Sequence, residues 1–272
     1  MTIAFDSAGA GPPLVLLHGT GSRRAVWDPV IAAVSRERRT LALDLPGFGA
    51  SPPEAFEPGI EGYVARLASW FADQGLDRPH VAGNSMGGGI ALELARARLV
   101  ASATAISPVG FWTRRELRFA QRSVAASRAI GGLIRPAVPA ITRSAVGRTT
   151  LFGQMRARPW RMPAGEAVAE LEAFVDAPWV GPVLQAFGRY RFHDGEELRG
   201  VPVTVAWGTR DALLIPRQAL RARRMLPWAR HVALRGCGHL PFHDDPEAVA
   251  AVLLAGSGQR VASALPLALC KW

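Results

Sequence analysis

The sequence predicts an α/β fold built on an open, doubly wound and mostly parallel sheet. Both flanks of the 272-residue chain alternate short apolar runs with segments of helical spacing, whereas the middle shows helical spacing alone. Parallel strands need crossover connections, so strands that alternate with helices indicate a parallel sheet covered on both faces. We therefore expect a core in two parts, residues 1–111 and 191–272, with a helical lid formed by residues 112–190 between them.

The first flank contains four expected strands, each a short apolar run followed by turn or polar residues. They cover residues 13–18, 40–43, 80–83 and 101–106. Apolar residues at helical spacing occupy the segments between these strands, at residues 27–34, 63–71 and 86–99. Strands and helices thus alternate up to the start of the middle segment.

The second flank resumes the alternation with strands and helices at residues 202–207, 217–225, 230–234 and 246–254. Pro246 suits the first position of the last helix, where the missing N–H is not needed. In the middle segment, glycines and prolines break the helical pattern into fragments. Residues 114–161 of that segment hold eleven arginines and one acid, Glu116, so we expect a strongly basic helical unit.

Composition and net charge limit the classes of partner that this chain is expected to bind. Hydrophobic residues make up 49% of the chain and charged residues 20%, the balance of a globular protein. No apolar run reaches the ~18 residues of a membrane span, so we expect no stable membrane insertion. The net charge of +10 invites a nucleic-acid partner, but the arginines are dispersed and no nucleic-acid module is recognisable, so none is expected.

The cysteines and the first residues of the sequence indicate in which cellular compartment the protein is expected. Cys237 and Cys270 have neither metal-ligand spacing nor the pattern of a small secreted domain. No basic residue precedes Arg23, and Asp6 interrupts the opening segment, so no secretory signal is expected. We therefore expect a cytoplasmic protein with reduced thiols.

The segment Gly83-Asn84-Ser85-Met86-Gly87 matches G-x-S-x-G between an expected strand and an expected helix. A serine at this sharp turn is held in a strained conformation with its hydroxyl exposed above the sheet. The following helix directs free N–H groups and its positive dipole end toward that position, which favours a developing oxyanion. Ser85 is therefore the candidate nucleophile.

A serine hydroxyl needs an adjacent base that is itself oriented by an acid. Asp211 and His239 follow two successive expected strands, at the sheet edge where open α/β folds build their sites. Their order after Ser85 is nucleophile, acid, histidine. We expect the backbone N–H groups of Thr20 and Met86 to form an oxyanion hole, and His18 to be structural.

Five segments together resemble the α/β-hydrolase superfamily, in its serine-nucleophile, lid-containing and esterase-like branch. They are Leu16-Leu17-His18-Gly19, Asp44 to Ser51, Gly83 to Gly88, Trp207 to Asp211, and Gly238-His239. The resemblance implies an eight-stranded, mostly parallel sheet with a helical cap inserted after the sixth strand, and a structural role for Asp44. Serine at the nucleophile position differs from the aspartate of haloalkane dehalogenases and epoxide hydrolases.

These residues predict a hydrolase that cleaves a carboxylic ester of a small or medium apolar substrate through an acyl-enzyme. Alternatives with the same triad are a carbon–carbon hydrolase of vinylogous diketones, whose elbow the segment Gly83 to Gly88 also resembles, and a cofactor-free perhydrolase or haloperoxidase. A non-catalytic binding protein on the same scaffold is a further alternative. The expected partner is a small-molecule substrate, with no cofactor.

No metal is expected either. His239, His243, Asp244 and Asp245 are potential ligands, but Pro241 and Pro246 prevent the helix that would place both histidines on one face. In the expected lid, aromatic residues are candidates to line an apolar pocket or to pack the lid on the core. They are Trp160, Phe174, Trp179 and Phe187.

Overall fold

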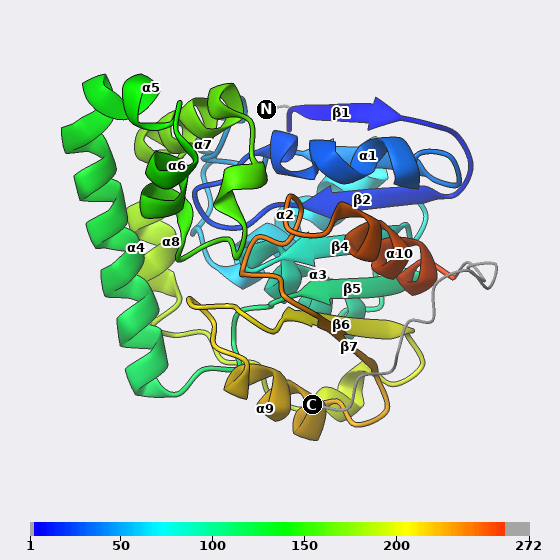
Figure 1. Cartoon of the computed structure of the whole chain (residues 1–272). Coiled ribbons are helices and arrows are strands. Elements are labelled where there is room, and N and C mark those ends of the chain that lie inside the picture. The colour runs from blue at the N-terminus through cyan, green and yellow to red at the C-terminus, as the bar shows by residue number, and fades with distance from the viewer. Residues whose placement is uncertain (1–2, 259–272) are drawn as a thin grey trace.

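In the computed structural model, which describes residues 3–258, seven strands form one sheet with helices on both faces (Figure 1). The strands are β1 (Phe5–Ala8), β2 (Pro13–Leu17), β3 (Arg39–Leu43), β4 (His80–Asn84), β5 (Ser102–Ile106), β6 (Val203–Gly208) and β7 (Arg230–Leu234). Their order in the sheet is β1-β3-β2-β4-β5-β6-β7. Only β1 runs antiparallel to its neighbour, β3.

The doubly wound α/β-hydrolase fold is confirmed, but the described residues hold seven strands and not the eight that the resemblance implied. The difference lies at the β1 edge of the sheet. Residues 3–12 provide a single antiparallel strand and a turn before β2 begins at Pro13. A hairpin of two strands does not fit into so short a segment, since strands usually span about five residues each.

Side chains that alternate along each strand pack into two separate hydrophobic cores, one on each face of the sheet. Leu14 and Leu16 of β2 face one core, whereas Val15 and Leu17 face the other. Helices α1 (Asp28–Val34) and α10 (Pro246–Gly256) cover the first face, and α2 (Ile60–Asp73), α3 (Met86–Arg96) and α9 (Arg217–Met225) supply the second core. Burial on both faces explains why the strands are continuous apolar runs rather than alternating ones.

The topology brings the candidate residues to one edge of the sheet. From β2 the chain moves to β3 on one side and then crosses to β4 on the other, so the strand order reverses between β2 and β4. Ligands of doubly wound sheets bind at the carboxyl ends of the strands at such a reversal. The loops after β2, β4, β6 and β7 all leave from this edge, which lies on the left in Figure 1.

A helical insertion follows β5 and lies over that edge (Figure 1). Its helices are α4 (Arg114–Ile134), α5 (Val138–Ile141), α6 (Ala145–Phe152), α7 (Ala164–Asp176) and α8 (Val180–Ala186). Thr113 and Glu116 form a capping box at the start of α4. A small core of its own includes Val138, Phe152 and Leu171.

Four short 3-10 helices complete the elements: η1 (Arg24–Trp27), η2 (Arg135–Ala137), η3 (Pro159–Arg161) and η4 (Gly195–Leu198). Among residues 3–258, no helix combines the length and apolar character needed to cross a lipid bilayer. Cys270 lies outside the described residues.

Candidate active site

Ser85 occupies the sharp turn between β4 and α3, with φ 56° and ψ −112°. A positive φ is rare for a residue with a side chain, so the turn is strained. Neighbouring backbone passes very close: a Cβ on Gly83 would lie 2.0 Å from the carbonyl oxygen of Gly87, and one on Gly87 would lie 2.2 Å from that of Leu17. Both glycines are required because no other residue fits these contacts.

Two backbone N–H groups without partners flank Ser85. Met86 is the first residue of α3, so its N–H has no acceptor within the helix. The Thr20 N–H makes no hydrogen bond within the described part of the chain. A Cβ on Gly19 would lie 3.1 Å from the Cβ of Ser85, so the turn that carries Thr20 runs directly beside the serine. This arrangement fits the oxyanion hole expected from the sequence.

Asp211 and His239 form a buried pair. The Nδ1 of His239 lies 2.8 Å from Oδ2 of Asp211, and the other carboxylate oxygen accepts the N–H groups of Leu213 and Leu214 at 2.9 and 2.8 Å. When Nδ1–H donates to Asp211, the lone pair on Nε2 is left free to accept a proton. The pair therefore has the arrangement of an oriented general base.

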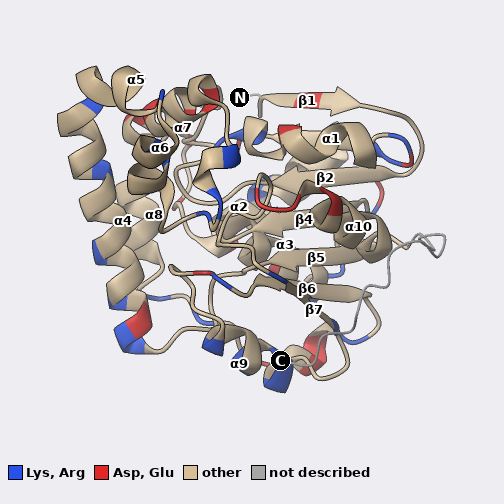
Figure 2. Cartoon of the chain, in the orientation of Figure 1, with Lys and Arg blue, Asp and Glu red and all other residues tan. Residues whose placement is uncertain are grey.

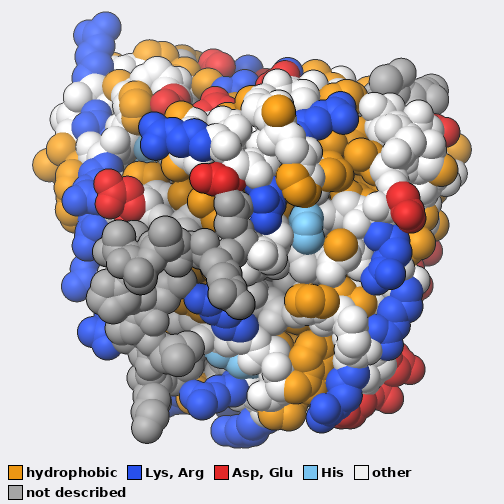
Figure 3. All heavy atoms as spheres, turned by 90° about the vertical axis from the view of Figure 1, so that its right-hand side faces the viewer, with side chains coloured by type: hydrophobic (Ala, Val, Ile, Leu, Met, Phe, Trp, Pro, Cys, Tyr) orange, Lys and Arg blue, Asp and Glu red, His pale blue; other side chains and the backbone are white. Residues whose placement is uncertain are grey.

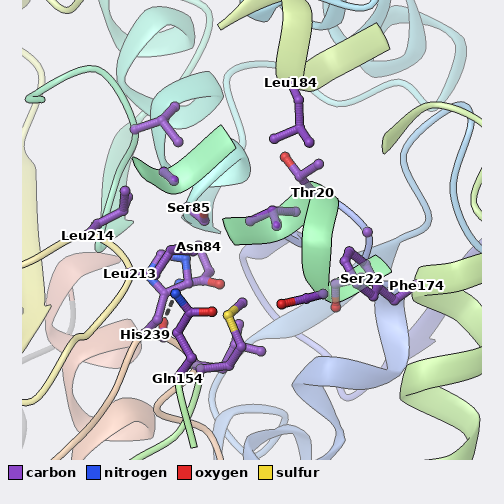
Figure 4. Close-up of a pocket in the computed structure, with 18 of the residues that line it drawn as sticks. Thr20, Ser22, Asn84, Ser85, Gln154, Phe174, Leu184, Leu213, Leu214 and His239 are labelled. Carbon is purple, nitrogen blue, oxygen red and sulfur yellow. Dashed lines mark hydrogen bonds between the residues drawn. The ribbon is translucent and has the colours of Figure 1, made fainter. Parts of the chain in front are cut away.

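Ser85 and His239 line the same cavity, although no hydrogen bond joins their side chains (Figure 4). Such bonds are often long in free enzymes and shorten when substrate binds. Asn84 holds the two loops together: its Nδ2 donates to the backbone oxygens of His239 at 3.0 Å and Ile106 at 3.2 Å. Sequence reasoning missed this role of Asn84, because a G-x-S-x-G pattern leaves that position open.

His18 and Asp44 support the loops around the site. The Nδ1–H of His18 donates to Gly19 O at 2.8 Å, and its Nε2 accepts the Leu45 N–H at 2.9 Å. Burial lowers the pKa of His18, so the ring stays neutral and keeps both bonds. The Asp44 carboxylate accepts the N–H groups of Arg24 and Ala50 at 2.6 and 2.8 Å.

Asp244 fastens the loop that carries His239 to the helical insertion. Its buried carboxylate accepts three backbone N–H groups, from Gly238 at 2.7 Å, Ala157 at 3.0 Å and Arg158 at 2.7 Å. The Leu240 N–H adds a bond of 2.7 Å to Met155 O. Sequence reasoning did not assign this role to Asp244, because its partners are backbone amides, two of them more than eighty residues away.

We expect Asp244→Asn to lower the free energy of unfolding by about 2–3 kcal/mol, because an amide nitrogen would face one of these donors in place of an acceptor. Because the loop then holds the imidazole less firmly, kcat should fall by about 10- to 100-fold. Urea titration and steady-state kinetics measure the two effects. Asp245→Asn is the control, because Asp245 caps α10 through the Ala248 N–H and asparagine caps equally well. Equal effects at both positions would contradict the role of Asp244.

Two other groups beside His239 do not form reactive sites. Burial, with the nearby carboxylates of Asp244 and Asp245, raises the pKa of the Cys237 thiol to about 12, so it does not compete as a nucleophile. Within the described residues, no group of three or more His, Cys, Asp or Glu side chains is placed to hold a metal ion. Asp244, one of the potential ligands, accepts hydrogen bonds from backbone N–H groups instead.

The cavity beside Ser85 has a volume of about 120 Å³ and mainly apolar walls. Helices α4 and α7 and the end of α8 provide many of these walls, among them Leu117, Leu171, Phe174 and Phe187, which directly follows α8. Of the four aromatic candidates, Trp179 instead packs on Phe56 and Tyr63, and Trp160 is half exposed.

Within the described residues, Glu170 is the only Asp, Glu, Lys or Arg that lines this cavity. Both of its carboxylate oxygens accept hydrogen bonds of 2.6 Å from the guanidinium of Arg156, which is fully buried. Gln121 and Gln154 add polar groups to the wall (Figure 4 labels Gln154). The arrangement therefore suits a substrate that is largely apolar and carries a few polar atoms.

A family model described as the alpha/beta hydrolase family matches residues 14–252. The chain therefore belongs to the alpha/beta hydrolase family. An uncharacterised protein of Mycobacterium tuberculosis is 29% identical over 261 residues, which span 89% of this chain and 74% of that protein. The 2-hydroxy-6-oxo-2,4-heptadienoate hydrolase of Pseudomonas putida is 42% identical over 95 residues, 34% of each chain.

Among solved structures, a membrane phospholipase A described as a bacterial virulence factor is similar with a TM-score of 0.73 and 28% identity. The similarity covers 95% of this chain and 84% of the phospholipase. Together with the family match, these comparisons support a hydrolytic activity.

Proposed function

We propose that this protein is a serine hydrolase that cleaves a carboxylic ester of a small or medium apolar substrate through an acyl-enzyme. The observation that carries the proposal is the buried Asp211–His239 pair, whose histidine lines one cavity together with a serine held at positive φ. A strained serine, an oriented base and unpaired N–H groups are the parts that acyl transfer requires.

In the proposed reaction, Ser85 Oγ attacks the ester carbonyl carbon while His239 Nε2 takes the hydroxyl proton. The N–H groups of Thr20 and Met86 bind the oxyanion, and the positive end of α3 adds to this stabilisation. The protonated His239 then gives its proton to the leaving alkoxide. Water attacks the acyl-enzyme with His239 as base, which releases the carboxylic acid and restores Ser85. Asp211 orients the imidazole throughout.

The cavity supports an apolar acyl or alcohol group. Leu, Val, Phe and Trp side chains form much of its walls, and no Lys or Arg of the described residues lines it. Since much of the wall comes from the helical insertion, we further propose that residues 112–190 act as a lid that encloses the substrate. The similarity to a phospholipase A is consistent with ester cleavage.

Carbon–carbon bond hydrolysis with the same triad is the second candidate, because 42% identity to a heptadienoate hydrolase covers a third of the chain. Such a substrate carries a carboxylate, however, and a buried anion requires a cation or several donors. Arg156 balances the charge of Glu170, so this pair offers no net positive charge to a carboxylate. The cavity therefore favours a neutral ester.

A fluorophosphonate probe tests the proposal directly, because it reacts with an activated serine. We expect stoichiometric labelling that maps to the peptide containing Ser85, and turnover within a panel of p-nitrophenyl esters of increasing acyl length. Failure to label, or labelling at another residue, would contradict the assignment. Turnover of a dienol-diketone without turnover of any ester would select the second candidate instead.

A further inference from the structure

Helix α4 presents two different faces to its surroundings. Its inner face packs toward the rest of the protein through Leu117 and Ala120, which line the cavity beside Ser85. No helix or strand among residues 3–258 covers its opposite face, which forms the left-hand margin of the molecule in Figure 1. We call this the outer α4 face, and its large side chains are Arg115, Arg118, Phe119, Arg122, Ile130 and Leu133. At 3.6 residues per turn these positions fall within a sector of about 120°.

The arginines of the outer α4 face are not neutralised. Arg115, Arg118 and Arg122 are exposed, and none of them has an ion pair or hydrogen bond to the described part of the chain. The one acid of the helix, Glu116, is engaged elsewhere, with the Thr113 N–H at 2.6 Å and with the guanidinium of Arg221. Figure 2 shows basic residues spaced along the ribbon of α4. This half of the face therefore carries a free positive charge of about three.

The same face also exposes large apolar side chains. Phe119 is 51% exposed, Ile130 57% and Leu133 85%. Only six large hydrophobic side chains are well exposed in residues 3–258, and five of them belong to the helical insertion. The opposite end of the molecule carries both acidic and basic side chains (Figure 3). Apolar exposure and unpaired arginines thus coincide on the insertion.

We propose that the outer α4 face docks this protein on the surface of an anionic lipid bilayer. An amphipathic helix binds such a surface by placing apolar side chains among the acyl chains and cationic ones at the headgroups. Phe119, Ile130 and Leu133 supply the apolar contacts, and Arg115, Arg118 and Arg122 meet the phosphates. From residue 115 to residue 133 the helix is about 27 Å long, enough to lie along the surface.

Other anionic partners fit this face less well. A nucleic acid offers phosphates to the arginines but no apolar surface for Ile130 and Leu133 at the other end of the helix. An acidic protein would need to complement both halves in one rigid arrangement, whereas a bilayer supplies charge and hydrocarbon together along the whole length. The inner side of the docked helix would remain in the cavity wall, so docking places the cavity near the lipid.

Vesicle co-sedimentation tests this proposal with the full-length protein. We expect binding to phosphatidylcholine vesicles that contain phosphatidylglycerol, little binding to phosphatidylcholine alone, and weaker binding at about 0.5 M than at about 0.05 M salt. Arg118→Gln/Arg122→Gln should lower the partition coefficient by roughly 25-fold, about fivefold for each arginine. Ile130→Gln/Leu133→Gln should lower it by at least about tenfold, because the apolar anchor is lost.

Arg36→Gln/Arg39→Gln is the matched control. Both arginines are exposed at the amino-terminal end of β3, away from the insertion, and the variant loses the same two charges. It should change binding by less than about twofold, since its charges lie at the opposite end of the strands from the insertion and are screened from the docked face.

Absence of vesicle binding by the wild-type protein would overturn the proposal, and so would an equal loss in the control variant. Binding to duplex DNA with no affinity for vesicles would assign the face to nucleic acid and would also overturn it. The readout does not depend on the proposed function, because the Ser85→Ala protein should bind vesicles as the wild type does. A failure of docking is thereby distinguished from a failure of catalysis.

Discussion

Replacing Ser85 with alanine is expected to lower kcat for a p-nitrophenyl ester by about four to six orders of magnitude. The hydroxyl is the only protein group in the proposed mechanism that bonds to the acyl carbon, so His239 and the oxyanion hole are left without the side chain that forms the acyl-enzyme. Alanine tolerates the positive φ no worse than serine does, and the unfolding free energy should therefore change by less than about 1 kcal/mol.

Ser107 provides the control for this experiment. It is also a buried serine at a strand end of the same sheet edge, with φ 44° and a hydroxyl that has no hydrogen-bond partner among residues 3–258. Ser107→Ala should change kcat by less than about threefold. Denaturant unfolding of both variants separates lost chemistry from lost structure. Residual ester turnover above one-hundredth of the wild-type rate in purified Ser85→Ala protein would refute the nucleophile assignment.

Asp211→Asn has the second largest expected effect, a fall in kcat of about three to four orders of magnitude. The Leu213 and Leu214 N–H groups would donate to the amide oxygen of the asparagine as they do to the carboxylate. The NH₂ group of the asparagine would therefore face Nδ1 of His239. Nδ1 must then accept a hydrogen bond, and the imidazole carries its proton on Nε2. A histidine in that tautomer cannot take the proton of Ser85.

The measurement for Asp211→Asn is kcat together with fluorophosphonate labelling, which should slow to a similar degree because both need the activated serine. Asp77→Asn removes the same charge at an exposed position and should leave both rates unchanged. A loss of less than about tenfold in Asp211→Asn would show that another group orients His239.

The sequence predicted where the site lies better than it predicted which residues surround the site. Strand ends carry strong local signals, namely an apolar run closed by glycine or a polar residue, and these signals located Ser85, Asp211 and His239 at one edge. Their catalytic roles stay predictions until they are measured. The turn at Ser85 was also foreseen, because glycine on both sides leaves little choice of geometry.

Tertiary contacts account for what sequence reasoning missed. Nothing in the local pattern shows that Asp244 accepts amides from Ala157 and Arg158, or that Phe174 reaches the cavity while Trp179 packs on Phe56. The periodicity of α4 could have separated its two faces, but it could not show which face the rest of the chain covers. Such choices depend on packing between segments far apart in the sequence.

The backbone hydrogen bonds that Asp244 accepts constrain how substrates enter the cavity. Residues 155–158 of the insertion and the loop that carries His239 share hydrogen bonds, so this corner cannot swing outward without pulling the imidazole along. A gate on this side would disconnect the base from the serine whenever it opened. Substrate could then not pass on this side while His239 transfers a proton, so the open form would be inactive.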